Sequence, residues 1–205
     1  MKQYHDLKVR AISSIVLLFL CALAIYGGEY VVCSGVLLLA VLSYREWIDM
    51  TVDRGKILGL LGLLVVILPN SALISIYAED PEIFIWLLIC VVSNDIGAYC
   101  IGRVIGGPKL LESISPNKTL GGFFGGLLSA LIGGSTFAIV SGLSMNFVLL
   151  TVPVAIFATA GDLFESFIKR KCSAKDSGSL IPGHGGVLDR VDGFIFSAPF
   201  LLYLL

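Results

Sequence analysis

The sequence has few charged residues and no cysteine pair of the kind that binds zinc. Charged side chains make up 14% of its 205 residues, against 57% hydrophobic residues and a mean hydropathy of +0.94. A chain this poor in charge lies outside the range of soluble globular domains. Its five cysteines include no CxxC pair, so we expect neither a zinc site nor a disulfide framework.

Internal repeats, low-complexity tracts and a basic face interleaved with aromatic residues are also missing. These absences argue against a solenoid, a disordered protein and a nucleic-acid-binding protein. What remains is an all-α polytopic integral membrane protein that forms one membrane domain.

Seven apolar runs predict about seven transmembrane helices; they cover 11–27, 30–44, 57–77, 83–101, 120–141, 147–160 and 193–205. Pro69 interrupts the third run, where we expect a kink. The last run would be only about 20 Å long as a helix, short of the roughly 30 Å hydrocarbon layer. We divide the chain into N-terminal helices over 1–85 and a catalytic region over 86–205, with cytoplasmic loops 102–119 and 165–192.

The basic residues indicate the orientation. With seven spans, all 14 Lys and Arg fall on one side, in the N-terminal tail and in the polar segments around 45–56, 102–119 and 162–192. The loops on the opposite side hold only acids, namely Glu29, Glu79, Asp80 and Glu82. The positive-inside rule therefore predicts a cytoplasmic N-terminus and a cytoplasmic polar face.

The segment 162–192 is unusually polar for this chain. If the sixth helix continues past Ala160, then Asp162, Ser166, Lys169 and Ser173 lie on one stripe. An acid at 162 needs a partner or a cation in such a setting.

Arg170 and Lys171 flank that stripe where the helix leaves the membrane. They suit phosphate groups or anionic lipid heads, but a snorkelling basic helix end explains them equally well.

The rest of this segment suits phosphate and a hard cation. Gly183, Gly185 and Gly186 allow backbone N–H groups to approach phosphate oxygens. Asp189 and Asp192 can reach one cation such as Mg²⁺ if a helix begins there, and Arg190 offers a planar fork to phosphate. A turn followed by a helix cap explains any one of these features, whereas their concentration in one segment favours a site.

Two distant segments add candidate residues. Asp95 is a carboxylate within a predicted span, which marks it as a site candidate. Segment 115–119 precedes a helix start, where the hydroxyls of Ser115 and Thr119 and the ammonium of Lys118 can meet an anion; a loop with an N-cap is the alternative. Glu46, in a Tyr-Arg-Glu-Trp cluster, is interpreted as an interfacial anchor.

The motifs Ser166-x-x-Lys169-Arg170, Lys175-Asp176-x-Gly178 and Pro182-x-His184-Gly185-Gly186-x-x-Asp189-Arg190-x-Asp192 resemble the phosphatidate cytidylyltransferase (CDP-diacylglycerol synthase) family. Asn94-Asp95-x-Gly97-Ala98-Tyr99-x-x-Gly102-Arg103 and Ser115-Pro116-Asn117-Lys118-Thr119 are similar to other segments of that family, so the resemblance covers about 86–205. Glu46 matches the family's N-terminal glutamate. This chain departs from the family pattern at Gly121, where a glutamate is common, and it is shorter than typical members.

The resemblance implies transfer of a cytidylyl group from CTP to phosphatidate, giving CDP-diacylglycerol and pyrophosphate in phospholipid biosynthesis at a bacterial inner membrane. It also implies Mg²⁺ held by Asp162, Asp189 and Asp192, with a second cation as an option. The catalytic residues would be Asp162, Lys169, Asp189 and Asp192. The substrate-binding residues would be Asp95, Ser115, Lys118, Thr119, Ser166, Arg170, Lys175, Asp176, His184, Gly185, Gly186 and Arg190.

Other functions stay open at this level. A CTP-dependent enzyme acting on another membrane lipid, such as a polyprenol kinase or an archaeal-type lipid cytidylyltransferase, would resemble this chain. An ion-coupled transporter that uses Asp95 and Asp162 is disfavoured because both acids lie near the predicted cytoplasmic face and no repeat is present. An inactive relative is disfavoured by the retained acids. The glycine-rich fifth run suggests a homodimer contact.

Overall fold

The computed structural model describes residues 16, 19, 22, 23, 25–181, 183 and 185–205. The ordered elements are α2 (Glu29–Thr51), a 3-10 turn (Val52–Arg54), α3 (Lys56–Glu79), α4 (Pro81–Ile105), β1 (Lys109–Leu111), β2 (Ser115–Thr119), α5 (Leu120–Val140), α6 (Met145–Lys171), α7 (Leu188–Val191) and α8 (Phe194–Leu204). Most of the first predicted run, and both histidines, lie outside the described residues.

Five of the described helices are long and apolar enough to cross a membrane: α2, α3, α4, α5 and α6. The prediction of a helical integral membrane protein is therefore confirmed. The predicted total of seven spans stays a prediction, since the first run falls outside the described part of the chain. The last helix, α8, has 11 residues, which makes about 16 Å at 1.5 Å per residue.

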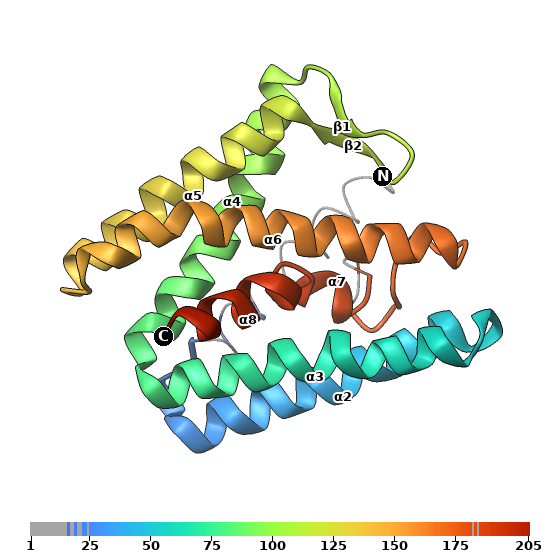
Figure 1. Ribbon diagram of the computed structural model, residues 1–205, viewed down its shortest axis with the longest axis horizontal. Coiled ribbons are helices and arrows are strands. Elements are labelled where there is room, and N and C mark those ends of the chain that lie inside the picture. Colours follow the sequence, from blue (N-terminus) through green and yellow to red (C-terminus); the bar gives the residue numbers. More distant parts are fainter. Residues whose placement is uncertain (1–15, 17–18, 20–21, 24, 182, 184) are drawn as a thin grey trace.

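The helices run back and forth, so their polar ends collect at one end of the bundle (Figure 1). The turn between α2 and α3, the β-hairpin, the end of α6 and the segment leading to α7 all lie toward the right in this view, whereas the α3–α4 junction lies at the left. The Lys and Arg residues of the described region lie in or next to the α2–α3 turn, the last turn of α4, the hairpin, the end of α6 and α7. The predicted one-sided charge distribution matches this topology.

The predicted loop 102–119 includes a short β-hairpin, which is a local addition to an otherwise helical fold. Strands β1 and β2 pair antiparallel, with Lys109 opposite Thr119 and Leu111 opposite Ser115. The hairpin leads directly into α5, because the Thr119 hydroxyl accepts a hydrogen bond from the Gly122 amide at 3.1 Å and caps the helix. The N-cap that was the alternative interpretation of this segment is thus present, and anion binding by the segment stays a prediction.

Glycines on α5 let it pack closely on α4. A Cβ at Gly122 would lie 2.8 Å from the Ala98 carbonyl, and one at Gly126 would lie 2.7 Å from Asn94 Oδ1. The glycine face is thus already occupied within the chain, which leaves no room there for the expected dimer contact. The outward face of α5 carries bulkier side chains such as Phe124 and Ile132.

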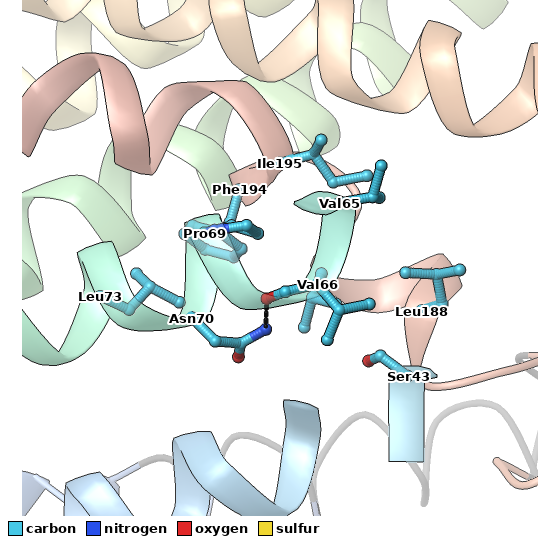
Figure 2. A pocket seen from close by; sticks show the side chains of 10 residues that line it. Ser43, Val65, Val66, Pro69, Asn70, Leu73, Leu188, Phe194 and Ile195 are labelled. Carbon is cyan, nitrogen blue, oxygen red and sulfur yellow. Dashed lines mark hydrogen bonds between the residues drawn. The ribbon is translucent and has the colours of Figure 1, made fainter. Parts of the chain in front are cut away.

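The N-terminal helices support the C-terminal ones. Helix α3 packs against α8, α8 packs against α6, and α2 contacts α7. Figure 2 shows the side chains around a small cavity of about 10 Å³ where these elements meet, with Ser43 from α2, Leu188 from α7 and Ile195 from α8. α3 stays helical across Pro69, and the Asn70 amide donates to the Val66 carbonyl at 2.7 Å. The expected kink stays a prediction.

Candidate active site

A polar cavity of about 760 Å³ lies between α4, the β-hairpin, the start of α5, the end of α6 and α7. Its size is within the roughly 300–1,000 Å³ typical of small-molecule sites. It brings together ten of the predicted site residues from five separate segments: Asp95, Ser115, Lys118, Thr119, Asp162, Lys169, Asp176, Asp189, Arg190 and Asp192. The prediction that these distant segments share one site is supported by this arrangement.

Helix α6 forms one wall of this cavity. It continues without a break through Lys171, as predicted, and it places Asp162 and Ser166 one turn apart. The Ser166 hydroxyl donates to Asp162 Oδ1 at 3.4 Å. Ser173 does not join the predicted stripe, because it follows the end of the helix with a φ of 59°; its hydroxyl instead accepts from Arg54 at 3.0 Å.

Lysines hold two of the predicted catalytic carboxylates. Lys118 from the hairpin forms an ion pair with Asp162 of α6, and so joins the two walls. The Lys169 ammonium lies 2.7 Å from Asp189 Oδ1 and 2.5 Å from Glu165 Oε2. The two lysines thus pair with acids of α6 and with Asp189 of α7.

Glu165 is a residue that sequence reasoning missed. It is fully buried, and its Oε1 atom has no hydrogen-bond partner among the described residues. Its position four residues before Lys169 is the spacing of a helical ion pair, which is the signal that could have found it. A buried acid of this kind needs a nearby cation, and Lys169 supplies one.

Asp189 is held as a carboxylate. Its oxygens accept from the backbone amides of Gly186 at 2.8 Å and Ser177 at 3.1 Å, in addition to Lys169. Burial alone would raise the pKa of Asp189, but the bonds from Lys169 and Gly186 outweigh it and bring the pKa below its usual range. Asp189 is thus the anchor of the segment before α7.

The pKa of Asp192 is shifted in the opposite direction to that of Asp189. Burial raises the pKa of Asp192 well above its usual range, and the nearby carboxylates of Asp162, Glu165 and Asp95 raise it further. Its Oδ1 accepts only the adjacent Gly193 amide at 2.8 Å among the bonds found in the described region. Asp192 is therefore close enough to three other acids for their charges to disfavour its ionised form.

This difference predicts how Asp192→Asn behaves. Because the fold favours the neutral form, the carboxylate of Asp192 costs stability as pH rises from about 4 toward its raised pKa. An amide avoids that cost and can keep the bond from Gly193. In the presence of a chelator at about pH 8, we expect the thermal midpoint of Asp192→Asn to equal or exceed that of the unmodified chain, while activity is lost. A clearly lower midpoint would contradict this account.

Glu46 joins the N-terminal helices to the site. It lies on α2 and is 4% exposed, and its carboxylate accepts from the amides of Val187 at 3.0 Å and Leu188 at 2.9 Å and from the Ser177 hydroxyl at 3.2 Å. The interpretation as an interfacial anchor is therefore wrong. The residue holds the start of α7, and nothing in the local sequence around 46 indicates a partner more than 130 positions away.

Some predicted residues lie outside the cavity wall. Arg170 bonds the Ile114 carbonyl at 3.1 Å and the Ala174 carbonyl at 3.3 Å, so it ties the hairpin to the end of α6. Lys175 is exposed beside the site. The Gly186 amide is bonded to Asp189, and a Cβ at Gly185 would also meet that carboxylate at 2.5 Å. Phosphate binding by these residues stays a prediction, and His184 lies outside the described residues.

The residues present fit a divalent cation by their chemistry. Asp162, Asp189 and Asp192 all line the cavity, and carboxylate oxygens are the ligands that Mg²⁺ takes. In the described residues, however, no three His, Cys, Asp or Glu side chains already stand in a metal-binding group. The lysine pairs of Asp162 and Asp189 would have to open for the three to share one ion.

Comparison with known proteins agrees with this site. The model of the cytidylyltransferase family matches residues 57–205, which include every wall of the cavity. The chain belongs to this family. It is 36% identical to the phosphatidate cytidylyltransferase of Rickettsia bellii over 99% of its own length and 92% of that protein. The corresponding protein of Brucella suis is 35% identical over 88% of this chain and 72% of the relative.

The phosphatidate cytidylyltransferase of Bacillus subtilis is 47% identical over 57% of this chain, and the match spans 45% of that relative. The resemblance seen in the sequence is thus confirmed, and the chain is a nucleotidyltransferase.

Gly121 is where the resemblance seen in the sequence led us to expect a glutamate. A Cβ there would lie 2.5 Å from the Gly106 carbonyl oxygen and 3.1 Å from the Ile105 side chain. The Gly121 amide also donates to that same carbonyl at 3.2 Å. The backbone at Gly106 therefore occupies the space that a glutamate would need.

We accordingly expect Gly121→Glu to lower the thermal stability of the protein and not to raise its activity. The measurement is a thermal midpoint and an initial rate for purified protein. Leu120→Glu is the matched control, because it adds the same charge at the start of α5 where the side chain is 38% exposed. A gain in activity from Gly121→Glu, with the midpoint unchanged, would contradict the steric account.

Proposed function

We propose that this protein transfers the cytidylyl group of CTP to phosphatidate, giving CDP-diacylglycerol and pyrophosphate. The observation that carries the proposal is the single cavity in which the predicted motif residues of α4, the hairpin, α6 and α7 meet. Its volume suits a nucleotide, and it is built at one end of a bundle whose helices are suited to lipid. The names and coverage of the relatives support the same reaction.

The chemistry needs positioning more than proton transfer. A phosphate oxygen of the lipid attacks the α-phosphorus of CTP, and the bond from that phosphorus to the departing pyrophosphate breaks. Because the attacking phosphate is already ionised near neutral pH, the site does not need a strong base. Lys118 and Arg190 line the cavity and can neutralise the phosphates, which is the main requirement of phosphoryl-type transfer.

Asp162, Asp189 and Asp192 would hold Mg²⁺ in the working enzyme, with a second cation as an option. A bound Mg²⁺ supplies charge neutralisation for the triphosphate. The part that Lys118 and Lys169 play would then be to balance the acids before a cation binds and to turn toward phosphate when the substrate enters.

The cellular setting follows from the same observations. We propose a bacterial inner membrane with the cavity on the cytoplasmic side, supported by the collection of Lys and Arg at that end of the bundle. Here CTP arrives from water and phosphatidate from the leaflet. A homodimer stays a prediction, and a contact through α5 would use its outward face of bulky apolar residues.

The direct test supplies membranes containing the protein with cytosine-labelled CTP, phosphatidate and Mg²⁺, and follows label into the lipid phase. We expect label in CDP-diacylglycerol and none when a chelator replaces Mg²⁺. A panel with polyprenol and ether-linked archaeal-type lipid distinguishes the related CTP-dependent enzymes. Label entering one of those lipids and not phosphatidate would overturn the proposal.

A further inference from the structure

One wall of the cavity belongs also to the outer surface of the bundle. Tyr99 on α4 is 65% exposed, and Arg103 one turn later is exposed too, yet both line the cavity. Val92 and Ile96 lie seven and three residues before Tyr99, and they are 44% and 59% exposed. Residues three or four apart share a helix face, so the edge of the cavity continues into an apolar surface of a membrane-spanning helix.

Tyr99 holds the Arg103 side chain at this edge. Arg103 Nη1 donates to the Tyr99 hydroxyl at 2.8 Å, and the guanidinium carbon lies 5.8 Å from the centre of the Tyr99 ring. A guanidinium has five N–H donors in a planar fork, and this bond uses one of them. The pair is therefore a pre-formed cationic group that suits a phosphate monoester.

The other cations of the site lie on different walls. Lys118 comes from the hairpin, Lys169 from α6 and Arg190 from α7. Lys118 and Lys169 contact the predicted metal ligands Asp162 and Asp189, and Arg190 follows Asp189 in the chain, so we assign these walls to the water-soluble triphosphate. Arg103 instead combines positive charge with an apolar helix face, and that combination is what a lipid with a charged headgroup requires.

We propose that Arg103 and Tyr99 form the subsite for the phosphate of the lipid substrate, which reaches the cavity sideways along the α4 face around Val92 and Ile96. The proposal rests on the proposed function, and it assigns the two substrates to different walls. The acyl chains stay against the apolar helix surface, the lipid phosphate meets the guanidinium, and the nucleotide takes the interior.

The test measures initial rates for purified protein in mixed micelles, varying phosphatidate at saturating CTP and then CTP at saturating phosphatidate. Arg103→Gln should raise the KM for phosphatidate about ten-fold or more, because a charge-assisted hydrogen bond to phosphate is lost. The KM for CTP should change less than about two-fold, because the nucleotide is not expected to lose a hydrogen bond, and even a neutral one would have a larger effect. Lys109→Gln is the control, since it removes an exposed cation from β1 that is not part of the wall.

Two kinetic results would overturn the subsite. One is an unchanged KM for phosphatidate in Arg103→Gln. The other is a rise in the KM for CTP, which would assign Arg103 to the nucleotide. Tyr99→Phe should give a smaller rise in the lipid KM, about three-fold, because it removes one neutral hydroxyl. If Arg103→Gln does not fold, Arg103→Lys keeps the charge without the fork and should still raise the lipid KM.

A binding measurement separates this inference from the proposed reaction. Phosphatidate labelled on an acyl chain is bound to the protein without CTP and displaced by unlabelled phosphatidate or by phosphatidylglycerol, whose phosphate is a diester. We expect the monoester to compete better in the unmodified protein, and Arg103→Gln to lose this preference. If the unmodified protein prefers the monoester but transfers no cytidylyl group, the proposed reaction is refuted and the subsite is not. If Arg103→Gln keeps the preference for the monoester, the subsite is refuted.

Discussion

Replacing Asp189 by Asn is expected to reduce cytidylyl transfer by about 10³-fold and to destabilise the protein. The carboxylate accepts from the Lys169 ammonium and from the Gly186 and Ser177 amides. An amide keeps one oxygen but turns its NH₂ group toward one of these donors. Losing one member of a buried ion pair typically costs about 3–5 kcal/mol, and loss of a preorganised charge at such a site costs about 10²–10³ in rate or more.

The measurement is the initial rate and the thermal midpoint of Asp189→Asn in detergent, with Asp53→Asn alongside. Asp53 is an exposed acid at the same end of the bundle, so its neutralisation should change neither value appreciably. Because the pKa of Asp189 is lowered in the fold, its contribution to stability is present above about pH 4 and is lost as pH falls through the lowered pKa. The stability of Asp189→Asn should therefore fall less than that of the unmodified protein as the pH is lowered through this range. Wild-type rates in Asp189→Asn would refute the assigned role.

Glu46→Gln is expected to have the second largest effect. Glu46 is far from the motif in sequence, yet its two oxygens accept the Val187 and Leu188 amides that begin α7. In the glutamine variant, one of these donors faces an NH₂ group instead of an acceptor. Each charged hydrogen bond contributes about 1.5–3 kcal/mol, so we expect a lower thermal midpoint and at least about a ten-fold lower rate.

Glu112→Gln is the matched control, because Glu112 is an exposed glutamate at the turn of the hairpin. Amide hydrogen exchange provides a local readout: the Val187 and Leu188 amides should exchange faster in Glu46→Gln, while α5 should be little changed. Uniformly faster exchange throughout the chain would show general unfolding. Unchanged exchange at Val187 and Leu188 together with full activity would contradict the positioning role.

The sequence alone predicted the class of protein and most of the cavity wall. Apolar runs must cross the bilayer as helices because lipid offers no partners for backbone groups, so hydropathy located α3, α4, α5 and α6. Clustered acids, bases and glycines in such a chain are costly unless they bind something. That cost is why Asp95, Lys118, Asp162 and Asp189 stand out in the sequence as site residues.

The sequence could not reveal how the charges pair. Lys169 lies on the predicted stripe, but its contacts to Glu165 and Asp189 depend on where α7 returns to α6. The same return places Gly186 against Asp189 instead of in the cavity wall. Local patterns report which face a residue occupies, whereas partners from another element depend on the packing of the whole bundle.

Composition and the apolar runs by themselves indicated a helical membrane protein, and the resemblance of the C-terminal polar motifs to a known family indicated a cytidylyltransferase. Only the tertiary structure decided that Glu46 of α2 holds α7, that backbone at Gly106 fills the space beside Gly121, and that Arg103 lines the cavity. The physical reason is that hydropathy acts on each segment separately, while a buried carboxylate or a close backbone contact is specified by elements far apart in the chain.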